Sequence, residues 1–252
     1  MHVFSATISD VKVLRDSIDT IAQLIDEGIL KVKPEGLEML AADRAMVAVI
    51  DFKLSANAFD SYSCDAPASL GLNLLNLLTI LKRAGTSDKL GLKLNNTDNR
   101  LELTLTGEST RKFAIPLLEL STEDVPNIGQ FAFTANAELS TDVLSNGIDD
   151  ADVIADSIII ELAPGKVKMW AEGDSSKTEL NLESGSVALS SVDAKEAVKA
   201  RYPLEYLKKI MKASKLAEKT TIKMGNDYPM RMDFSGDKAK IGFVLAPRVS
   251  EE

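Results

Sequence analysis

The sequence has one cysteine, one histidine and no long apolar run, and each scarcity excludes a class of protein. Cys64 by itself cannot form an intrachain disulfide, which fits a reducing compartment. His2 is the only histidine, and because it stands at the N-terminus we expect it to be neither the base of a catalytic triad nor a useful metal ligand. No apolar stretch approaches the ~20 residues of a membrane-spanning helix. Residues 1–10 lack the basic start and apolar core of a signal peptide, so we expect no membrane partner.

Signals for catalysis and for cofactor binding are equally scarce. No glycine-rich phosphate loop is present. Asp149, Asp150, Asp152 and Asp156 are close in sequence, but they lack the glycine and the final glutamate of a calcium-binding loop. We therefore expect no catalytic residue, no metal and no cofactor, and we predict that the chain is not an enzyme. A metal-dependent hydrolase that uses these aspartates is kept as an alternative hypothesis.

The net charge of the chain, taken alone, argues against binding to nucleic acid. The 252 residues carry a formal net charge of −9, whereas proteins that bind phosphate backbones usually leave a basic footprint. The length allows two modest domains or one large domain. The distribution of the charges along the chain therefore matters more than their sum.

The second half of the chain repeats the order of predicted elements in the first half. Hydrophobic periodicity predicts helices over residues 10–26, 72–84, 140–149 and 203–215, among β-rich stretches in each half. Residues 81–84 (LKRA) align with residues 210–213 (IMKA) at an offset of 129. The buried side of the second helix is predicted to consist of Leu74, Leu75, Leu77, Leu78 and Leu81. The period exceeds that of solenoid repeats, so we predict a duplicated α+β domain with helices on one face of antiparallel sheet.

A connector is predicted between the two copies, over residues 118–130. Its acids, proline and glycine are typical of an extended linker. However, Leu118, Leu120, Val125 and Ile128 are too many apolar residues for a fully solvated segment, so we expect it to lie against the protein. The predicted domains are then residues 1–117 and 131–252.

Several short motifs carry a resemblance to a known family. They are residues 24–27 (LIDE), 62–65 (YSCD), 81–85 (LKRAG), 225–230 (GNDYPM) and 245–249 (LAPRV), the last followed by acids. With the duplication and the connector, the whole chain resembles the proliferating cell nuclear antigen family in its archaeal form. The resemblance implies a closed trimeric ring with sheets outside and helices lining the hole. Such a ring encircles duplex DNA without reading its sequence, confers processivity on DNA polymerase, and docks replication and repair enzymes.

The resemblance also implies where subunits would meet. In the family, an edge strand of the first domain pairs with an edge strand of the neighbour's second domain. The matching segments here are residues 110–117 and 174–182. The expected apolar contributors are Phe113, Ile115, Leu180 and Leu182.

Basic residues on the predicted helices are the candidates for DNA contact. They are Lys12, Arg15, Lys82, Arg83, Lys208, Lys209, Lys212 and Lys215. Contact with phosphate alone would be loose and salt-sensitive, as sliding requires. An ordinary solvated face is the alternative interpretation. The predicted helix at 140–149 carries no base, unlike eukaryotic members, so its contact with DNA stays open.

The family docks short peptides from its partners in a pocket beneath the connector. By position, that pocket would be lined by Ala42, Val47, Val125, Ile128, Pro229, Val244, Ala246 and Pro247. These residues are small or apolar, which suits aromatic anchors, although plain core packing is the alternative. The expected partners are DNA polymerase, the clamp loader, ligase and flap nuclease. The expected location is cytoplasmic and nucleoid-associated, or nuclear for a eukaryotic source.

Two further readings of the same features remain open. One is a checkpoint-type clamp subunit of a heteromeric ring, against which the complete docking pocket argues. The other is a monomeric interaction scaffold. The sequence also leaves open whether a ring would be homotrimeric or heterotrimeric.

Overall fold

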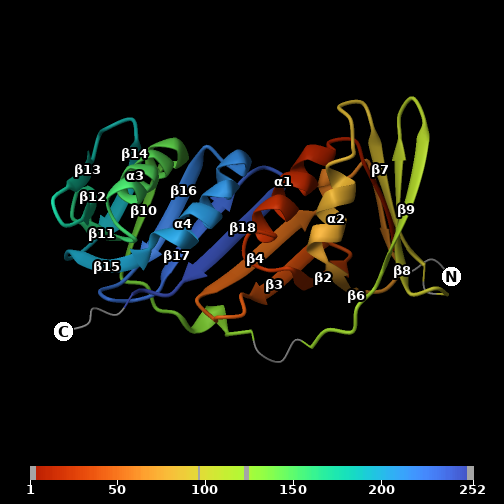
Figure 1. Ribbon diagram of the computed structural model, residues 1–252, viewed down its shortest axis with the longest axis horizontal. Helices are drawn as coiled ribbons and strands as arrows, with labels where there is room; N and C mark the ends of the chain where they lie inside the picture. The colour runs from red at the N-terminus through yellow and green to blue at the C-terminus, as the bar shows by residue number, and fades with distance from the viewer. Residues whose placement is uncertain (1–3, 96, 122–124, 249–252) are drawn as a thin grey trace. The chain divides into compact units, whose positions relative to one another are not determined.

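The structure, a computed structural model, describes residues 4–95, 97–121 and 125–248 (Figure 1). His2, the acids Glu123 and Asp124 of the predicted connector, and Val249 of the C-terminal motif lie outside the described residues. The chain divides into two compact units. Unit 1 comprises Met1–Arg44, Ile50–Val125 and Gly236–Ile241, and unit 2 comprises Ala45–Val49, Pro126–Ser235 and Gly242–Glu252.

Unit 1 contains two antiparallel sheets. The first has the order β5-β1-β7-β8-β9, formed by β1 (Phe4–Ile8), β5 (Ser61–Cys64), β7 (Lys89–Asn95), β8 (Arg100–Thr106) and β9 (Thr110–Pro116). In the second, β2 (Glu27–Lys33) pairs with β3 (Gly36–Ala42) on one side and β6 (Ala68–Asn73) on the other. Strand alternation sets the core: in β8, Leu101, Leu103 and Leu105 are buried while their neighbours are more exposed.

The two helices of unit 1 lie side by side (Figure 1). α1 (Val11–Ile21) ends five residues earlier than predicted, because residues 22–25 form a turn that leads into β2. α2 (Leu74–Leu81) begins after Asn73, whose side chain accepts a hydrogen bond from the Asn76 N–H. Leu75 was predicted to be buried, which is wrong: it is 46% exposed. It lies off the stripe that helical spacing creates at positions 74, 77, 78 and 81.

Unit 2 also contains two antiparallel sheets. One has the order β13-β12-β11-β15, formed by β11 (Ser157–Ala163), β12 (Lys166–Glu172), β13 (Lys177–Glu183) and β15 (Val198–Pro203). The other contains β14-β10-β16-β17, formed by β10 (Ala135–Ser140), β14 (Leu189–Ala194), β16 (Lys219–Met224) and β17 (Met230–Ser235). Short 3₁₀ turns are found at Ala56–Ala58 in unit 1 and at Ile128–Gln130 in unit 2.

The helices of unit 2 pack against both of its sheets. α3 (Thr141–Ile154) begins at the Ser140 cap and contacts β10, β11, β12 and β13. It runs past the predicted end at residue 149, because Ile148 and Ala151 continue its buried stripe. α4 (Leu204–Ile210) tightens into a 3₁₀ segment, η3 (Met211–Leu216). Together they match the predicted helix at 203–215 to within one residue at each end.

Two long strands belong to both units and are hydrogen-bonded neighbours. They are β4 (Ala48–Ser55) and β18 (Ala239–Leu245). Within unit 1 the Ser55 N–H donates to the Lys238 carbonyl at 3.0 Å. Within unit 2 the Ala246 N–H donates to the Val47 carbonyl at 2.9 Å. The two strands therefore run antiparallel, with a constant register between these two bonds.

The predicted duplication is present, but the offset of 129 is not kept along the whole chain. α2 begins at residue 74 and α4 at residue 204, and β2 and β11 begin at 27 and 157, so these elements are offset by 130. The hairpin registers agree, since Val32 faces Leu37 and Leu162 faces Val167. A one-residue slip between two amphipathic helices still aligns many apolar positions, which is why the sequence alone favoured 129.

Candidate binding surfaces

β9 and β13 lie at edges of their sheets, as β5 and β14 also do. Among the strands that the structure describes, β9 pairs with β8 alone and β13 with β12 alone. These strands cover most of the two segments predicted at subunit contacts. Unpaired N–H and C=O groups along such an edge can bond to another strand. Each edge is therefore able to extend its sheet onto a second chain.

The four apolar residues predicted for these edges fall into two kinds. Ile115 and Leu182 are buried within their own units, at 3% and 8% exposure. Phe113 and Leu180 are only half-buried. Ile115 and Leu182 therefore contribute to the cores of unit 1 and unit 2, respectively. Phe113 and Leu180 are the apolar side chains that the two edges can offer to a neighbouring chain.

The basic residues on the helices of unit 1 are largely paired with acids on the same surface. Lys12 Nζ lies 2.7 Å and Arg15 Nε lies 3.3 Å from the carboxylate of the buried Asp16. Lys82 Nζ lies 2.9 Å from Asp19 Oδ1. Acids from the same helices therefore offset much of the positive charge on this surface.

Arg83, the fourth predicted base of unit 1, is exposed beyond the end of α2. Its carbonyl accepts a hydrogen bond of 3.1 Å from Arg111 Nη1, on β9. Arg111 also forms an ion pair with the buried Asp88, which in turn accepts the Gly85 N–H at 2.7 Å. The loop that carries Arg83 is thus tied to the edge strand.

Unit 2 repeats the pattern of paired bases. Lys208 on α4 forms an ion pair with Asp152 on α3, which raises the pKa of the lysine. Lys209 Nζ lies 2.7 Å from Glu205 Oε1 and 5.4 Å from the centre of the Tyr206 ring. Lys212 is exposed. Sequence reasoning missed these pairs, because Asp152 and Lys208 are 56 residues apart and meet only in the fold.

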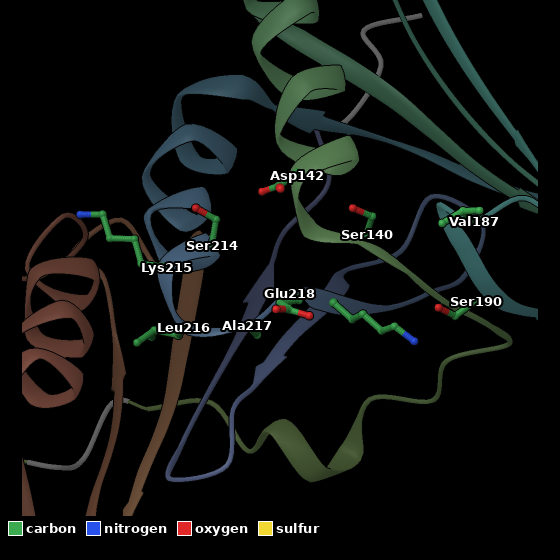
Figure 2. Close-up of a pocket in the computed structure, with 10 residues that line it drawn as sticks. Ser140, Asp142, Val187, Ser190, Ser214, Lys215, Leu216, Ala217 and Glu218 are labelled. Carbon is green, nitrogen blue, oxygen red and sulfur yellow. The ribbon is translucent and has the colours of Figure 1, made fainter. Parts of the chain in front are cut away.

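Lys215 lines an open pocket of about 510 Å³ in unit 2. Figure 2 shows Ser140 and Asp142 at the start of α3 and Ser214 and Lys215 at the end of η3 around it. Its walls are mainly polar and carry both signs of charge. None of the residues predicted to receive aromatic anchors lines it, so this pocket is separate from the predicted docking groove.

The start of the connector lies against unit 1, as its apolar residues predicted. The Leu118 N–H donates to the Gly71 carbonyl at 2.9 Å, which adds the connector to the edge of β6. An open pocket of about 450 Å³ there is lined by Ile29, Gly71, Leu118 and Leu120, among others. A methyl group on Gly71 would stand 2.1 Å from the Leu118 carbonyl oxygen. Only glycine allows this close approach.

The predicted groove residues are half-buried, with one exception. In unit 1, Ala42 ends β3, and Val125 lies within the connector. In unit 2, half-buried positions are Val47, Ile128, Pro229, Ala246 and Pro247. Val244 is 5% exposed within β18, so its side chain belongs to the core.

Two exposed apolar residues near these positions were missed by sequence reasoning. They are Leu40, 40% exposed in unit 1, and Met46, 48% exposed in unit 2. Met46 directly precedes Val47 and has a φ of 57°, a left-handed conformation that costs a non-glycine residue roughly 1–2 kcal/mol. A methionine beside the polar stretch Asp43-Arg44 was the available signal. Strained, exposed residues of this kind are common at binding sites.

The aspartates of the alternative hydrolase hypothesis do not come together as a metal site. Within residues 4–95, 97–121 and 125–248, no group of three or more His, Cys, Asp or Glu side chains could hold a metal ion. Asp152 is paired with Lys208, and Asp156 with Arg248. Across the same residues, no helix has the length and apolar character needed to cross a membrane.

Two copies of one α+β unit, each with a helix pair packed on antiparallel sheets, define a DNA-clamp fold. The model for the N-terminal domain of proliferating cell nuclear antigen matches residues 3–127, and the model for its C-terminal domain matches residues 127–249. The chain therefore belongs to the proliferating cell nuclear antigen family.

Relatives and solved structures agree with this assignment. The "DNA polymerase sliding clamp" of Pyrococcus furiosus is 34% identical over 249 residues, covering 98% of this chain and 99% of that protein. The protein of that name from Pyrococcus abyssi is 32% identical over the same length. The crystal structure of PCNA from Thermococcus kodakaraensis matches with a TM-score of 0.90 at 27% identity, over 97% of this chain and all of that one. The predicted family, duplicated fold and sliding-clamp function are confirmed at this level.

Proposed function

We propose that this chain is one subunit of a trimeric ring that encircles duplex DNA and holds DNA polymerase on it. The observation that carries the proposal is a correspondence between strands. β4 begins at residue 48 and β13 at 177, while β9 begins at 110 and β18 at 239, so both pairs are separated by 129 residues. β4 and β18 bond to each other within the chain. β9 and β13 are their counterparts, and each lies at an edge of its sheet.

The β4–β18 register predicts how two chains would meet. Ser55 faces Lys238, and Val47 faces Ala246. Transferring this register by 129 residues places Phe113 of one chain directly opposite Leu180 of the next. These are the two half-buried apolar side chains of the edges, so the transferred register also makes sense of their exposure. A head-to-tail contact of this kind closes into a ring when the rotation between subunits is right.

The first test is size and register together. Light scattering should give three times 27.2 kDa for the protein expressed alone. In a Cys64→Ser background, Phe113→Cys combined with Leu180→Cys should oxidise to a covalent trimer, because directly opposed residues bring their Cβ atoms within disulfide reach. The matched control pairs Phe113→Cys with Glu183→Cys, three positions away. Equal cross-linking of both pairs would show that the register is wrong.

We infer that the helix surface of Lys12, Arg15, Lys82, Arg83, Lys208, Lys209, Lys212 and Lys215 faces the DNA. Their neighbouring acids keep the surface only weakly basic, which suits contacts that must exchange as the ring slides. Changing Lys208, Lys209 and Lys212 together to glutamate should lower loading and processivity while the trimer survives. The control changes three exposed lysines on strands and turns, Lys166, Lys195 and Lys199, in the same way. Equal losses of loading and processivity in the two triple variants would show that the helices do not face the DNA.

We infer that partners dock through short peptides where the connector and the C-terminal segment expose Ile128, Ala246 and Pro247. Polymerase, clamp loader, ligase and flap nuclease are the expected owners of such peptides. Ile128→Ala combined with Pro247→Ala should weaken the binding of a labelled peptide with two aromatic anchors by a few kcal/mol. Val153→Ala removes an exposed apolar side chain elsewhere in unit 2 and serves as the control. Unchanged affinity in the double variant would place the groove elsewhere.

The remaining parts of the proposal follow from the same role. A clamp acts by holding DNA and its partners, so we propose that it performs no chemistry and that Asp150→Ala leaves its action unchanged. The working location would be the cytoplasm, on the nucleoid. Residues 1–117 and 131–252 would be the clamp domains, joined by the connector at 118–130.

A further inference from the structure

The C-terminal segment of the described chain is held at two points by its backbone. The Ala246 N–H donates to the Val47 carbonyl at 2.9 Å, and the Arg248 N–H donates to the Arg201 carbonyl at 2.7 Å. Pro247, between them, has no N–H to donate. The segment thus runs from the start of β4 to β15, and its shape depends on both bonds.

The second point of attachment is reinforced by an ion pair. Arg248 Nη1 lies 2.6 Å from Asp156 Oδ1. The hydrogen bond from Arg248 lowers the pKa of the Asp156 carboxyl, and the same bond raises the pKa of the guanidinium. The two side chains are 47% and 75% exposed, so the pair lies at the surface, where ions and binding partners can reach it.

Asp156 presents its carboxylate from the short link between α3 and β11. It stands two residues beyond the end of α3 at Ile154 and directly before β11. Its own carbonyl accepts the N–H of Leu204, the first residue of α4, at 3.0 Å. The end of one helix, the start of another and the first residue of a strand therefore fix its position. The other partner, Arg248, is the last residue of the described chain.

We propose that Asp156 is a positioning residue for partner docking, which holds Arg248 and thereby keeps the Ala246–Pro247 surface in the shape that a clamp-binding peptide recognises. This rests on the proposed function, in which that surface borders the docking groove. With the ion pair intact, the peptide meets an ordered segment. Without it, the peptide must order the segment on binding, and affinity falls.

The aspartates at the end of α3 thus have different roles. Asp152 is directed to Lys208 on the neighbouring helix, whereas Asp156 is directed to the C-terminal segment. This difference supplies a matched control, since Asp152→Asn and Asp156→Asn remove the same charge four residues apart. Asn also keeps the backbone carbonyl of residue 156 that receives the Leu204 N–H.

The experiment measures two quantities in the full chain. The first is the dissociation constant of a labelled peptide with two aromatic anchors. Because exposed ion pairs contribute about 0.2–1 kcal/mol, Asp156→Asn should raise the dissociation constant of the peptide by about 1.4- to 5-fold. Asp152→Asn should leave this dissociation constant unchanged. The second is amide hydrogen exchange at Arg248, which should become faster in Asp156→Asn while Ala246 keeps its protection.

A double-variant cycle decides whether the effect passes through Arg248. In an Arg248→Gln background, Asp156→Asn should change neither peptide affinity nor exchange any further. An equal effect of Asp156→Asn with and without Arg248 would overturn the proposal, as would unchanged exchange at Arg248. If the wild-type chain fails to bind the peptide, the proposed docking function has failed. The exchange measurement then still shows whether the ion pair holds the segment.

Discussion

The ammonium group of Lys82, one residue beyond α2, lies 2.9 Å from a carboxylate oxygen of Asp19 on α1. A base proposed to contact DNA is therefore already engaged by an acid from the neighbouring helix. A phosphate must compete with that acid, which weakens each contact and shortens its lifetime. The acids of this surface would consequently weaken the binding of the ring to DNA.

Replacing Asp19 with asparagine should strengthen DNA association of the assembled ring. Lys82 becomes available to phosphate, so the salt dependence should steepen by up to about one unit in log–log slope. The measurement is a salt titration of clamp–DNA association. Glu35→Gln, in an exposed turn between β2 and β3, removes the same charge away from the helices. If Glu35→Gln has the same effect, net charge rather than Lys82 is responsible.

Gly71→Ala should detach the start of the connector from β6. The added methyl would stand 2.1 Å from the Leu118 carbonyl oxygen, so the backbone must move. We expect a loss of about 1–3 kcal/mol in stability, typical of forced overpacking, and faster exchange of the Leu118 amide. Gly91→Ala is the control, because its methyl would meet Thr104 at an ordinary 3.8 Å. Normal protection of Leu118 in Gly71→Ala would contradict this account of the anchor.

Phe113→Asp should convert the trimer to monomers. The half-buried ring lies on the open edge of β9, and an unpaired carboxylate in a strand-to-strand contact is costly. Light scattering at micromolar concentration measures the outcome. Lys89→Asp introduces an aspartate at an exposed position of β7, an interior strand, and should stay trimeric. A trimer in both variants would mean that β9 is not the contact.

Glu179, on the open edge strand β13, should titrate far below an ordinary glutamate. Its pKa is lowered from 4.5 to about 2, first by the hydrogen bond from Asn181 and then by Lys168. A lowered folded-state pKa gives stability that is complete above pH 4.5 and is lost as the pH falls toward about 2. Asn181→Ala should raise this pKa, measured by NMR of the carboxyl carbon, whereas Asn136→Ala in β10 should not. A titration near pH 4.5 in the wild type would refute the prediction.

The helices show what could and could not be predicted from sequence. The stripe of Leu14 and Ile18 in α1 follows directly from spacing, and both are buried. The helix predicted at 140–149 contains Gly147, and glycine lowers helix propensity. In the structure a methyl on Gly147 would stand 3.1 Å from the Met169 Cε atom, so the glycine permits close packing on β12. Packing against β12, which helix propensity does not take into account, therefore stabilises this helix.

The candidate surfaces divide in the same way. Edge strands and the apolar connector could be located from sequence pattern and resemblance. The exposed Met46 could not, because its exposure depends on a left-handed turn. Nor could the role of Asp156, whose partner Arg248 is 92 positions further along the chain. Boundaries of the domains and the roles of the surface residues stay predictions until the variants above are made.

The open edges β9 and β13 also differ in charge. β9 carries Arg111 and Lys112, while β13 carries Glu179 and Glu183 beside Lys177. A contact between β9 and β13 would bring an edge with two bases to an edge with two acids, which favours this pairing. We therefore expect subunits to associate head to tail, with β9 of one chain against β13 of the next, rather than through two copies of the same edge. In the proposed ring, subunits joined head to tail would all present the same face on the same side. Partners bound to that face would then approach DNA from one direction.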